Sequence, residues 1–175
     1  MPTPALASLT LDRAPSPIGE LLLASDAQGR LRAVDFHDYE ERMLRLLRLH
    51  YGEVTLEPGA APAATRTALT AYFEGELAAL ATIAWATGGT TFQQAVWRAL
   101  GEVAPGTTQT YAALAARIGK PAAVRSVGAA NGANPLSIVV PCHRLVGANG
   151  ALTGYGGGVE RKAWLLAHEG ARPRA

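Results

Sequence analysis

Two short helices joined by a tight turn are predicted by residues 110–132, TYAALAARIGKPAAVRSVGAANG. The first helix covers 111–118 and begins after Thr110, whose side chain can accept a hydrogen bond from the first helical turn. A glycine and a lysine form the turn, and Pro121 stands in the first turn of the second helix, where proline is well tolerated. This is the outline of a helix-turn-helix, although many purely structural helix pairs share it.

The second helix carries almost only small side chains, and Arg125 is its one charged residue. Its interior Gly128 costs about 1 kcal/mol relative to alanine, so a close approach to this helix is expected. Two interpretations fit: tight packing against another helix, or entry of a smooth face into a nucleic-acid groove with Arg125 projecting. The small residues of that face include Ala123, Ser126 and Ala129.

The single cysteine of the chain, Cys142, follows a β-branched run, 137–140, that predicts a buried strand. A lone cysteine is most often a small buried hydrophobe. Here, however, His143 and Arg144 follow directly, and basic or cationic neighbours raise the fraction of reactive thiolate. Because neighbouring side chains of a strand face opposite ways, His143 would reach the thiol only through a turn or a bridging water.

A glycine-rich loop and a helix complete this half of the chain. The loop, 154–158, exposes backbone N–H groups but lacks the spacing of a dinucleotide- or phosphate-binding loop. The helix covers 159–168, and Gly170 is its C-cap. Glu169 is either a solvated surface acid or the carboxylate that orients His143.

The front half predicts a mixed α/β scaffold without a reactive group of side chains. Apolar runs at 21–24 and 31–36 flank an Asp-Ala-Gln-Gly turn and predict a β-hairpin. Helical periodicity follows over 39–51 and 62–77. The Thr-Gly-Gly-Thr-Thr segment 87–91 is the best linker, because its glycines and threonines interrupt every periodicity; beyond it a helix is expected from Phe92 to Val103.

Charge divides the chain at the same linker. Residues 1–87 hold 7 Lys and Arg against 11 Asp and Glu, a net charge of −4, whereas residues 88–175 hold 9 against 3, a net charge of +6. An acidic front and a basic back predict two modules, with any polyanion bound by the second.

Composition excludes several classes of protein. The longest nearly apolar run, 77–86, is about half of a membrane span, and the first residues lack the features of a secretory signal. One cysteine excludes an internal disulfide and a zinc site made of several cysteines. We therefore expect a protein of the reducing cytoplasm, with no metal and no membrane contact.

Taken together, the motifs of the back half resemble the O6-alkylguanine-DNA alkyltransferases, most closely the bacterial single-cysteine type. The resemblance is dense over 90–170 and looser over 31–51, and the Pro-Cys-His-Arg segment with its flanks is highly specific. The motifs are Tyr111, Arg125-Ser126-Val127-Gly128-Ala129-Ala130-Asn131-Gly132, Asn134-Pro135, Ile138-Val139-Val140-Pro141-Cys142-His143-Arg144, Gly154-Tyr155, Gly157-Gly158, Glu160-Arg161-Lys162 and Trp164-Leu165-Leu166-Ala167-His168-Glu169-Gly170.

The resemblance implies an α/β (α+β) protein of two domains. Residues 1–86 would form a ribonuclease-H-like scaffold, 87–91 the linker, and 92–175 a mostly helical domain with a winged helix-turn-helix that binds DNA and accepts the alkyl group. The implied activity is direct-reversal DNA repair: one irreversible transfer from O6-alkylguanine, or O4-alkylthymine, to the protein's own cysteine after nucleotide flipping. The partner is double-stranded DNA, no cofactor is required, and the protein would be a monomer that can cluster on DNA.

The resemblance also assigns roles residue by residue. Cys142 is the nucleophile, His143 acts as base through a water, and Glu169 orients His143. Tyr111 donates to a guanine ring nitrogen, and Asn134 holds the active-site turn. Arg125 fills the gap left in the base stack, beside Ala123, Ser126 and Ala129 on the DNA-binding helix. The base pocket is formed by Leu145, Tyr155, Gly156 and Asn131.

Three other functions compete with this one. A non-catalytic binder of DNA lesions would keep the helix-turn-helix but lack the nucleophile, so the presence of Cys142 disfavours it. A transcription regulator would carry several Arg, Asn or Gln side chains on its recognition helix, whereas only Arg125 and Asn131 lie on or near this one. A Cys–His hydrolase would need an oxyanion-binding group, and the sequence offers none that is convincing.

Overall fold

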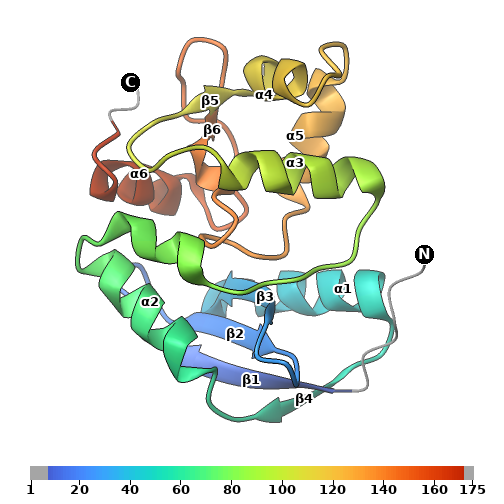
Figure 1. Cartoon of the computed structure of the whole chain (residues 1–175), viewed down its shortest axis with the longest axis vertical. Helices are drawn as coiled ribbons and strands as arrows, with labels where there is room; N and C mark the ends of the chain where they lie inside the picture. Colours follow the sequence, from blue (N-terminus) through green and yellow to red (C-terminus); the bar gives the residue numbers. More distant parts are fainter. Residues whose placement is uncertain (1–7, 172–175) are drawn as a thin grey trace. The chain divides into compact units, whose positions relative to one another are not determined.

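The computed structural model describes residues 8–171, and these fold as two compact units that meet in sequence between Gly89 and Thr90. That boundary falls inside the expected linker 87–91 (Figure 1). The expectation that no secretory signal is present concerns residues 1–7, which lie outside the described residues.

The N-terminal unit contains a four-stranded sheet in the order β3-β2-β1-β4. Its strands are β1 (Ser8–Ala14), β2 (Leu21–Ser25), β3 (Leu31–Phe36) and β4 (Thr55–Pro58). The hairpin predicted from the two apolar runs is confirmed, since β2 and β3 pair antiparallel. Strands β1 and β4 were not predicted, because both are largely polar. Strand β1 pairs antiparallel with β2 and parallel with β4.

The helices of this unit follow their predicted positions with changed ends. A 3-10 turn, η1 (His37–Tyr39), precedes α1 (Glu40–Tyr51), whose apolar side packs with the sheet in one hydrophobic cluster. The helix expected over 62–77 is shorter, because α2 (Ala63–Phe73) ends in a Schellman motif in which Gly75 adopts a φ of 110°. A separate 3-10 helix, η2 (Leu77–Thr82), follows it.

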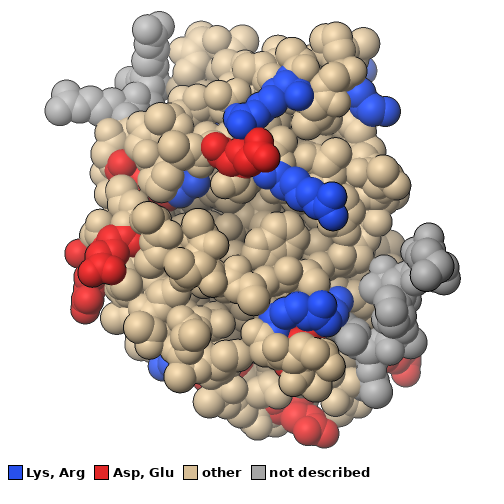
Figure 2. Space-filling view, in the orientation of Figure 1, with Lys and Arg blue, Asp and Glu red and all other residues tan. Residues whose placement is uncertain are grey.

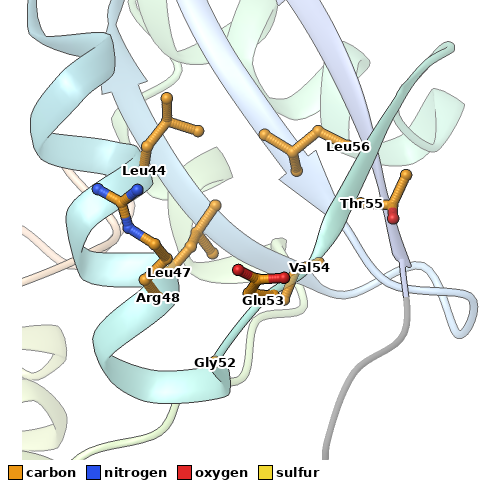
Figure 3. A pocket seen from close by; sticks show the side chains of 8 residues that line it. All are labelled: Leu44, Leu47, Arg48, Gly52, Glu53, Val54, Thr55 and Leu56. Carbon is orange, nitrogen blue, oxygen red and sulfur yellow. The ribbon is translucent and has the colours of Figure 1, made fainter.

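A groove of about 460 Å³ lies between α1 and β4 (Figure 3). Leu44 and Leu47 come from α1 and Leu56 comes from β4, so the groove has apolar walls, and Arg48 and Glu53 also line it. None of these side chains is among the expected site residues, and the groove contains no nucleophile.

The C-terminal unit is mostly helical. Its elements are α3 (Thr91–Gly101), β5 (Gln109–Thr110), α4 (Tyr111–Arg117), α5 (Val124–Gly132), η3 (Cys142–Arg144), β6 (Leu145–Val146) and α6 (Val159–His168). The two short strands pair in parallel, and α4 and α5 form the expected helix-turn-helix. The predicted caps are present: Thr110 Oγ1 accepts from the N–H of Ala113 at 3.0 Å, and Gly170 ends α6 with a φ of 81°.

Two local predictions in this unit are wrong. Helix α5 begins at Val124, and Pro121 belongs to the preceding turn, which the Ala123 N–H closes on the Lys120 carbonyl at 2.9 Å. The strand expected over 137–140 is a buried turn, in which Ile138 adopts a φ of 71°. β-Branched residues favour strands, but here hydrogen bonds within the segment occupy the backbone groups that a sheet would need.

The described residues contain no helix that is long and apolar enough to span a membrane. Among the same residues, no three His, Cys, Asp or Glu side chains come together in a way that could hold a metal ion. On the face drawn in Figure 2, Lys and Arg side chains are scattered, and in the upper half an acidic side chain lies between two of the basic groups.

Candidate active site

Two asparagines fix the turn that presents Cys142. Asn134, just beyond α5, donates from Nδ2 to the Val140 carbonyl at 2.9 Å and accepts the N–H of Leu136 on Oδ1 at 3.0 Å. Asn131, in the last turn of α5, donates to the carbonyl of Cys142 itself at 3.4 Å. The thiol-bearing residue is 5% exposed and begins the short helix η3. The end of the predicted recognition helix therefore contacts the backbone of the candidate nucleophile directly.

A buried network of three ionisable side chains adjoins the cysteine. Glu169, which follows α6, lies 2.8 Å from Nε2 of His143 and accepts two hydrogen bonds of 2.8 Å from the guanidinium of Arg144. Arg144 also donates to the carbonyl of Val103 at 2.6 Å. His143 is fully buried, and its Nδ1 has no hydrogen-bond partner within residues 8–171.

The charges of this network follow from its contacts. Burial by itself would raise the pKa of Glu169, but hydrogen bonds from Arg144 and His143 hold that pKa far below its usual range. Burial lowers the pKa of His143, with Glu169 opposing the shift and the nearby cations of Arg144 and Lys162 adding to it. Near neutral pH the carboxylate is therefore charged and the imidazole neutral. A neutral imidazole beside a carboxylate carries its proton on Nε2, which leaves Nδ1 as an acceptor.

Lys162 is a buried cation of the same region. Its ammonium donates to the carbonyl of Leu145 at 2.5 Å and to that of Thr153 at 3.4 Å. Burial lowers the pKa of Lys162, and the charge of a Cys142 thiolate opposes that shift. The ammonium thus connects the strand after the nucleophile to the loop before α6.

Two tyrosines border the site. Tyr111 opens α4, and its hydroxyl lies 2.7 Å from Oγ1 of Thr153. Its ring lies beside Gly128, where an added Cβ would stand 3.8 Å from the ring. Tyr155 packs edge-on against the imidazole of His143, with ring centroids 6.4 Å apart.

Both units match sequence models of one protein family. Residues 91–171 match the model described as the DNA-binding domain of 6-O-methylguanine DNA methyltransferase, and residues 12–84 match the model of its ribonuclease-like domain. This chain belongs to the 6-O-methylguanine DNA methyltransferase family. The family, the two-domain fold and the enzyme class expected from the sequence are thereby confirmed.

Curated members of the methyltransferase family align over nearly the whole chain. A methylated-DNA–protein-cysteine methyltransferase of Salmonella typhimurium is 52% identical over 157 residues, which are 89% of this chain and 92% of that protein. The protein of the same name from Mycobacterium tuberculosis is 45% identical over 162 residues, 91% of this chain and 92% of the relative.

Solved structures of methyltransferases in this family share the fold. The crystal structure of Mycobacterium tuberculosis OGT in complex with DNA has a TM-score of 0.77 and 40% identity, and the match covers 92% of each chain. The O6-methylguanine-DNA methyltransferase of Pyrococcus kodakaraensis has a TM-score of 0.65 and 26% identity, over 93% of this chain and 99% of that one.

The residues expected to contact DNA lie on the outer face of α5. Arg125, Ser126 and Ala129 are exposed, and Ala123 is half-buried just before the helix. The inner face of α5 packs closely, since the indole N–H of Trp97 donates to the Ala130 carbonyl at 2.9 Å. Close packing therefore accounts for one side of the small-residue helix, while its other side presents small residues to solvent.

Most of the expected site residues come together. Asn131 bonds to the carbonyl of Cys142, and Glu169 and Tyr155 both contact His143, the next residue. Asn134 holds the turn before Cys142, and Leu145 follows η3 with its side chain fully buried. Gly156 lies in the half-buried turn that precedes α6.

Sequence reasoning missed three side chains of this methyltransferase site. Arg144 was noticed as a positive charge but not as the partner of Glu169, and no role was found for Lys162 or Thr153. A signal existed for Lys162, because a lysine three residues before Leu165 lies on the apolar side of its helix. No local signal marked Thr153, whose partner is 42 residues away.

Proposed function

We propose that this chain repairs alkylated DNA by moving the alkyl group of O6-alkylguanine, or of O4-alkylthymine, onto the sulfur of Cys142. One observation carries the proposal: the only cysteine precedes a buried, neutral histidine whose Nε2 faces a fixed carboxylate and whose Nδ1 has no partner within residues 8–171. The names of its relatives, methylated-DNA–protein-cysteine methyltransferases, support the same activity.

The first step is removal of the thiol proton. Nδ1 of His143 accepts it through a bridging water, and the ionised Glu169 stabilises the imidazolium that results. The Glu169 carboxylate keeps its own charge, because Arg144 holds it with two hydrogen bonds. The ammonium of Lys162 adds positive charge near the sulfur, which favours the thiolate.

The thiolate then attacks the alkyl carbon. A carbon–sulfur bond forms, the bond between that carbon and O6 breaks, and the electron pair stays with the base. Tyr111 donates its hydroxyl proton toward N3 of the ring, so the base leaves without a full negative charge. The carbonyls of Cys142 and Leu145 face the exocyclic amine of guanine in this proposal, and the backbone of Gly156 lies beside the alkylated oxygen.

The same proposal explains the construction of α5. A face of small residues fits a minor groove that large side chains would block, and Arg125 fills the place of the nucleotide that turns into the pocket. The crystal structure of Mycobacterium tuberculosis OGT was solved in complex with DNA, which supports double-stranded DNA as the partner of this chain. We place the protein in the reducing cytoplasm as a monomer that clusters on DNA, which sedimentation with and without duplex would test.

The thioether product is not cleaved by water, so each molecule acts once. Intact-mass spectrometry after mixing with a duplex that contains O6-methylguanine tests this directly. We expect one added methyl group per molecule, none with an unmodified duplex, and none in a Cys142→Ala variant. Tight binding of the lesion duplex by both proteins without any change in mass would instead establish a damage-recognition module.

A further inference from the structure

A contact between two distant hydroxyl groups lies inside the proposed site. Tyr111 opens α4, Thr153 belongs to the loop between β6 and α6, and their side-chain oxygens are 2.7 Å apart. The pair is only partly buried, so it is not a hydrogen bond of the core.

Each partner is held independently of the other. The ring of Tyr111 lies beside Gly128 of α5, where an added Cβ would stand 3.8 Å from the ring, in ordinary van der Waals contact. Thr153 is fixed at two points: its carbonyl accepts from the ammonium of Lys162 at 3.4 Å, and its methyl group lies 3.3 Å from the position of a Cβ on Gly147. With the methyl group directed at Gly147, the hydroxyl is left facing the phenol. The short distance is therefore imposed by the surrounding fold.

One proton lies between two oxygens in such a pair, and either oxygen can donate it. A phenol that donates to Thr153 has no proton to offer the base. When Tyr111 turns its proton to a ring nitrogen, Thr153 can rotate its own O–H to donate to the phenol oxygen. Hydrogen bonds in such a chain strengthen one another, and the second bond stabilises the negative charge that grows on the phenol oxygen.

We propose that Thr153 is a positioning residue for Tyr111: its hydroxyl donates to the phenol oxygen while Tyr111 donates to N3 of the alkylated guanine. N3 is the expected acceptor because it flanks the amine on the side away from the alkylated O6. Lys162 donates to the carbonyls of both Leu145 and Thr153. The Leu145 carbonyl, which we propose accepts from the exocyclic amine of guanine, therefore lies near the Tyr111–Thr153 pair. This inference rests on the proposed function.

The test measures single-turnover methyl transfer to duplexes with O6-methylguanine or its 3-deaza analogue, in which a C–H replaces N3. Thr153→Val keeps the shape of the side chain and removes the hydroxyl. It should slow transfer from O6-methylguanine by about 3- to 10-fold, the range expected for one hydrogen bond. On the 3-deaza duplex, Thr153→Val and the wild type should react at equal rates. Thr153→Ser, which restores a hydroxyl, should recover most of the lost rate.

Rates are normalised to the fraction of protein that is alkylated at completion, so misfolded molecules do not contribute. An equal loss on both duplexes would mean that Thr153 only shapes the loop, and no loss on O6-methylguanine would mean that Tyr111 acts without it; either result overturns the proposal. Failure of the wild type itself to gain a methyl group would refute the proposed function instead.

Discussion

At Glu169, one buried carboxylate serves two neighbours with different tasks. It lies 2.8 Å from His143, the proposed base, and it pairs with Arg144, whose side chain is 5% exposed. A pair of charges buried at this depth is costly to break, because the remaining charge loses both water and partner.

We therefore expect Glu169→Gln to lower the free energy of unfolding by about 3–5 kcal/mol and to slow alkyl transfer as well. Urea unfolding and single-turnover kinetics measure the two effects. The matched control is Glu102→Gln, which removes an exposed ion pair with Arg117 and should change stability by less than about 1 kcal/mol. Equal losses in the two variants would contradict this account of the buried network.

The buried His143 predicts how stability depends on pH. Burial holds its folded pKa below the ordinary 6.5, so as the pH falls below 6.5 the unfolded chain binds a proton that the folded chain does not. The free energy of unfolding should therefore decrease as the pH is lowered from 6.5 to 5. This residue contributes at most about 1.4 kcal/mol per pH unit to that decrease. Urea titrations should give a shallower slope for His143→Gln; an unchanged slope would show that His143 does not titrate differently on folding.

Among the elements, α5 combines two surfaces with opposite requirements. Its inner residues pack closely against α3, and its C-terminal end holds the nucleophile turn through Asn131 and Asn134. Its outer residues are small and exposed. Stability and DNA binding should therefore depend on different sides of one helix.

Ala129→Leu places a bulky side chain on the exposed face of α5. It should weaken binding to a lesion duplex at least about tenfold, because the smooth face proposed to enter the groove is lost. Thermal unfolding should change little, because the position is exposed. The control Ala167→Leu adds the same bulk to an exposed position of α6. Fluorescence anisotropy with labelled duplex separates the two variants. Equal affinity of Ala129→Leu and the wild type would exclude this face from the interface.

On the scale of the whole molecule, three aspartates of the N-terminal unit pair with arginines. Asp12 pairs with Arg66, Asp35 with Arg42, and Asp26 with Arg30 and Arg32. A ribonuclease-like sheet therefore carries no cluster of acids, within residues 8–171, that could hold a catalytic metal.

Tyr51, the last residue of α1, connects two distant segments of the N-terminal unit by hydrogen bonds. Its hydroxyl accepts from Arg32 at 3.2 Å and from the N–H of Gly88, near the end of the unit, at 3.1 Å. Tyr51→Phe removes two buried hydrogen bonds, those from Arg32 and from Gly88, and should lower the free energy of unfolding by about 1–3 kcal/mol. The rate of alkyl transfer per folded molecule should not change. A slower reaction at full folding would show that the scaffold acts on the chemistry.

Short-range patterns in the sequence were enough to predict the helix-turn-helix, its Thr110 cap and the division into two units, and they singled out Cys142 as the proposed nucleophile. Each depends on neighbours within a few residues or on the period of a helix, and these act on the backbone locally. The side chains around Cys142 depend instead on long-range contacts. Arg144 and His143 meet Glu169 from more than 20 residues away, and Tyr111 meets Thr153 across the unit.

Hydrogen bonds of one side chain, Asn134, outweigh strand propensity in the turn before Cys142. The β-branched run before Cys142 favours a strand, yet Asn134 bonds to the backbone of Leu136 and Val140 and so occupies groups that would otherwise pair in a sheet. Strand propensity is worth about a few tenths of a kcal/mol per residue. Leaving one buried backbone group without a hydrogen bond costs about 1–3 kcal/mol, which outweighs that preference. The sequence therefore singled out the residue proposed to react, whereas side-chain hydrogen bonds decided the conformation of the turn before it and distant segments supplied its partners.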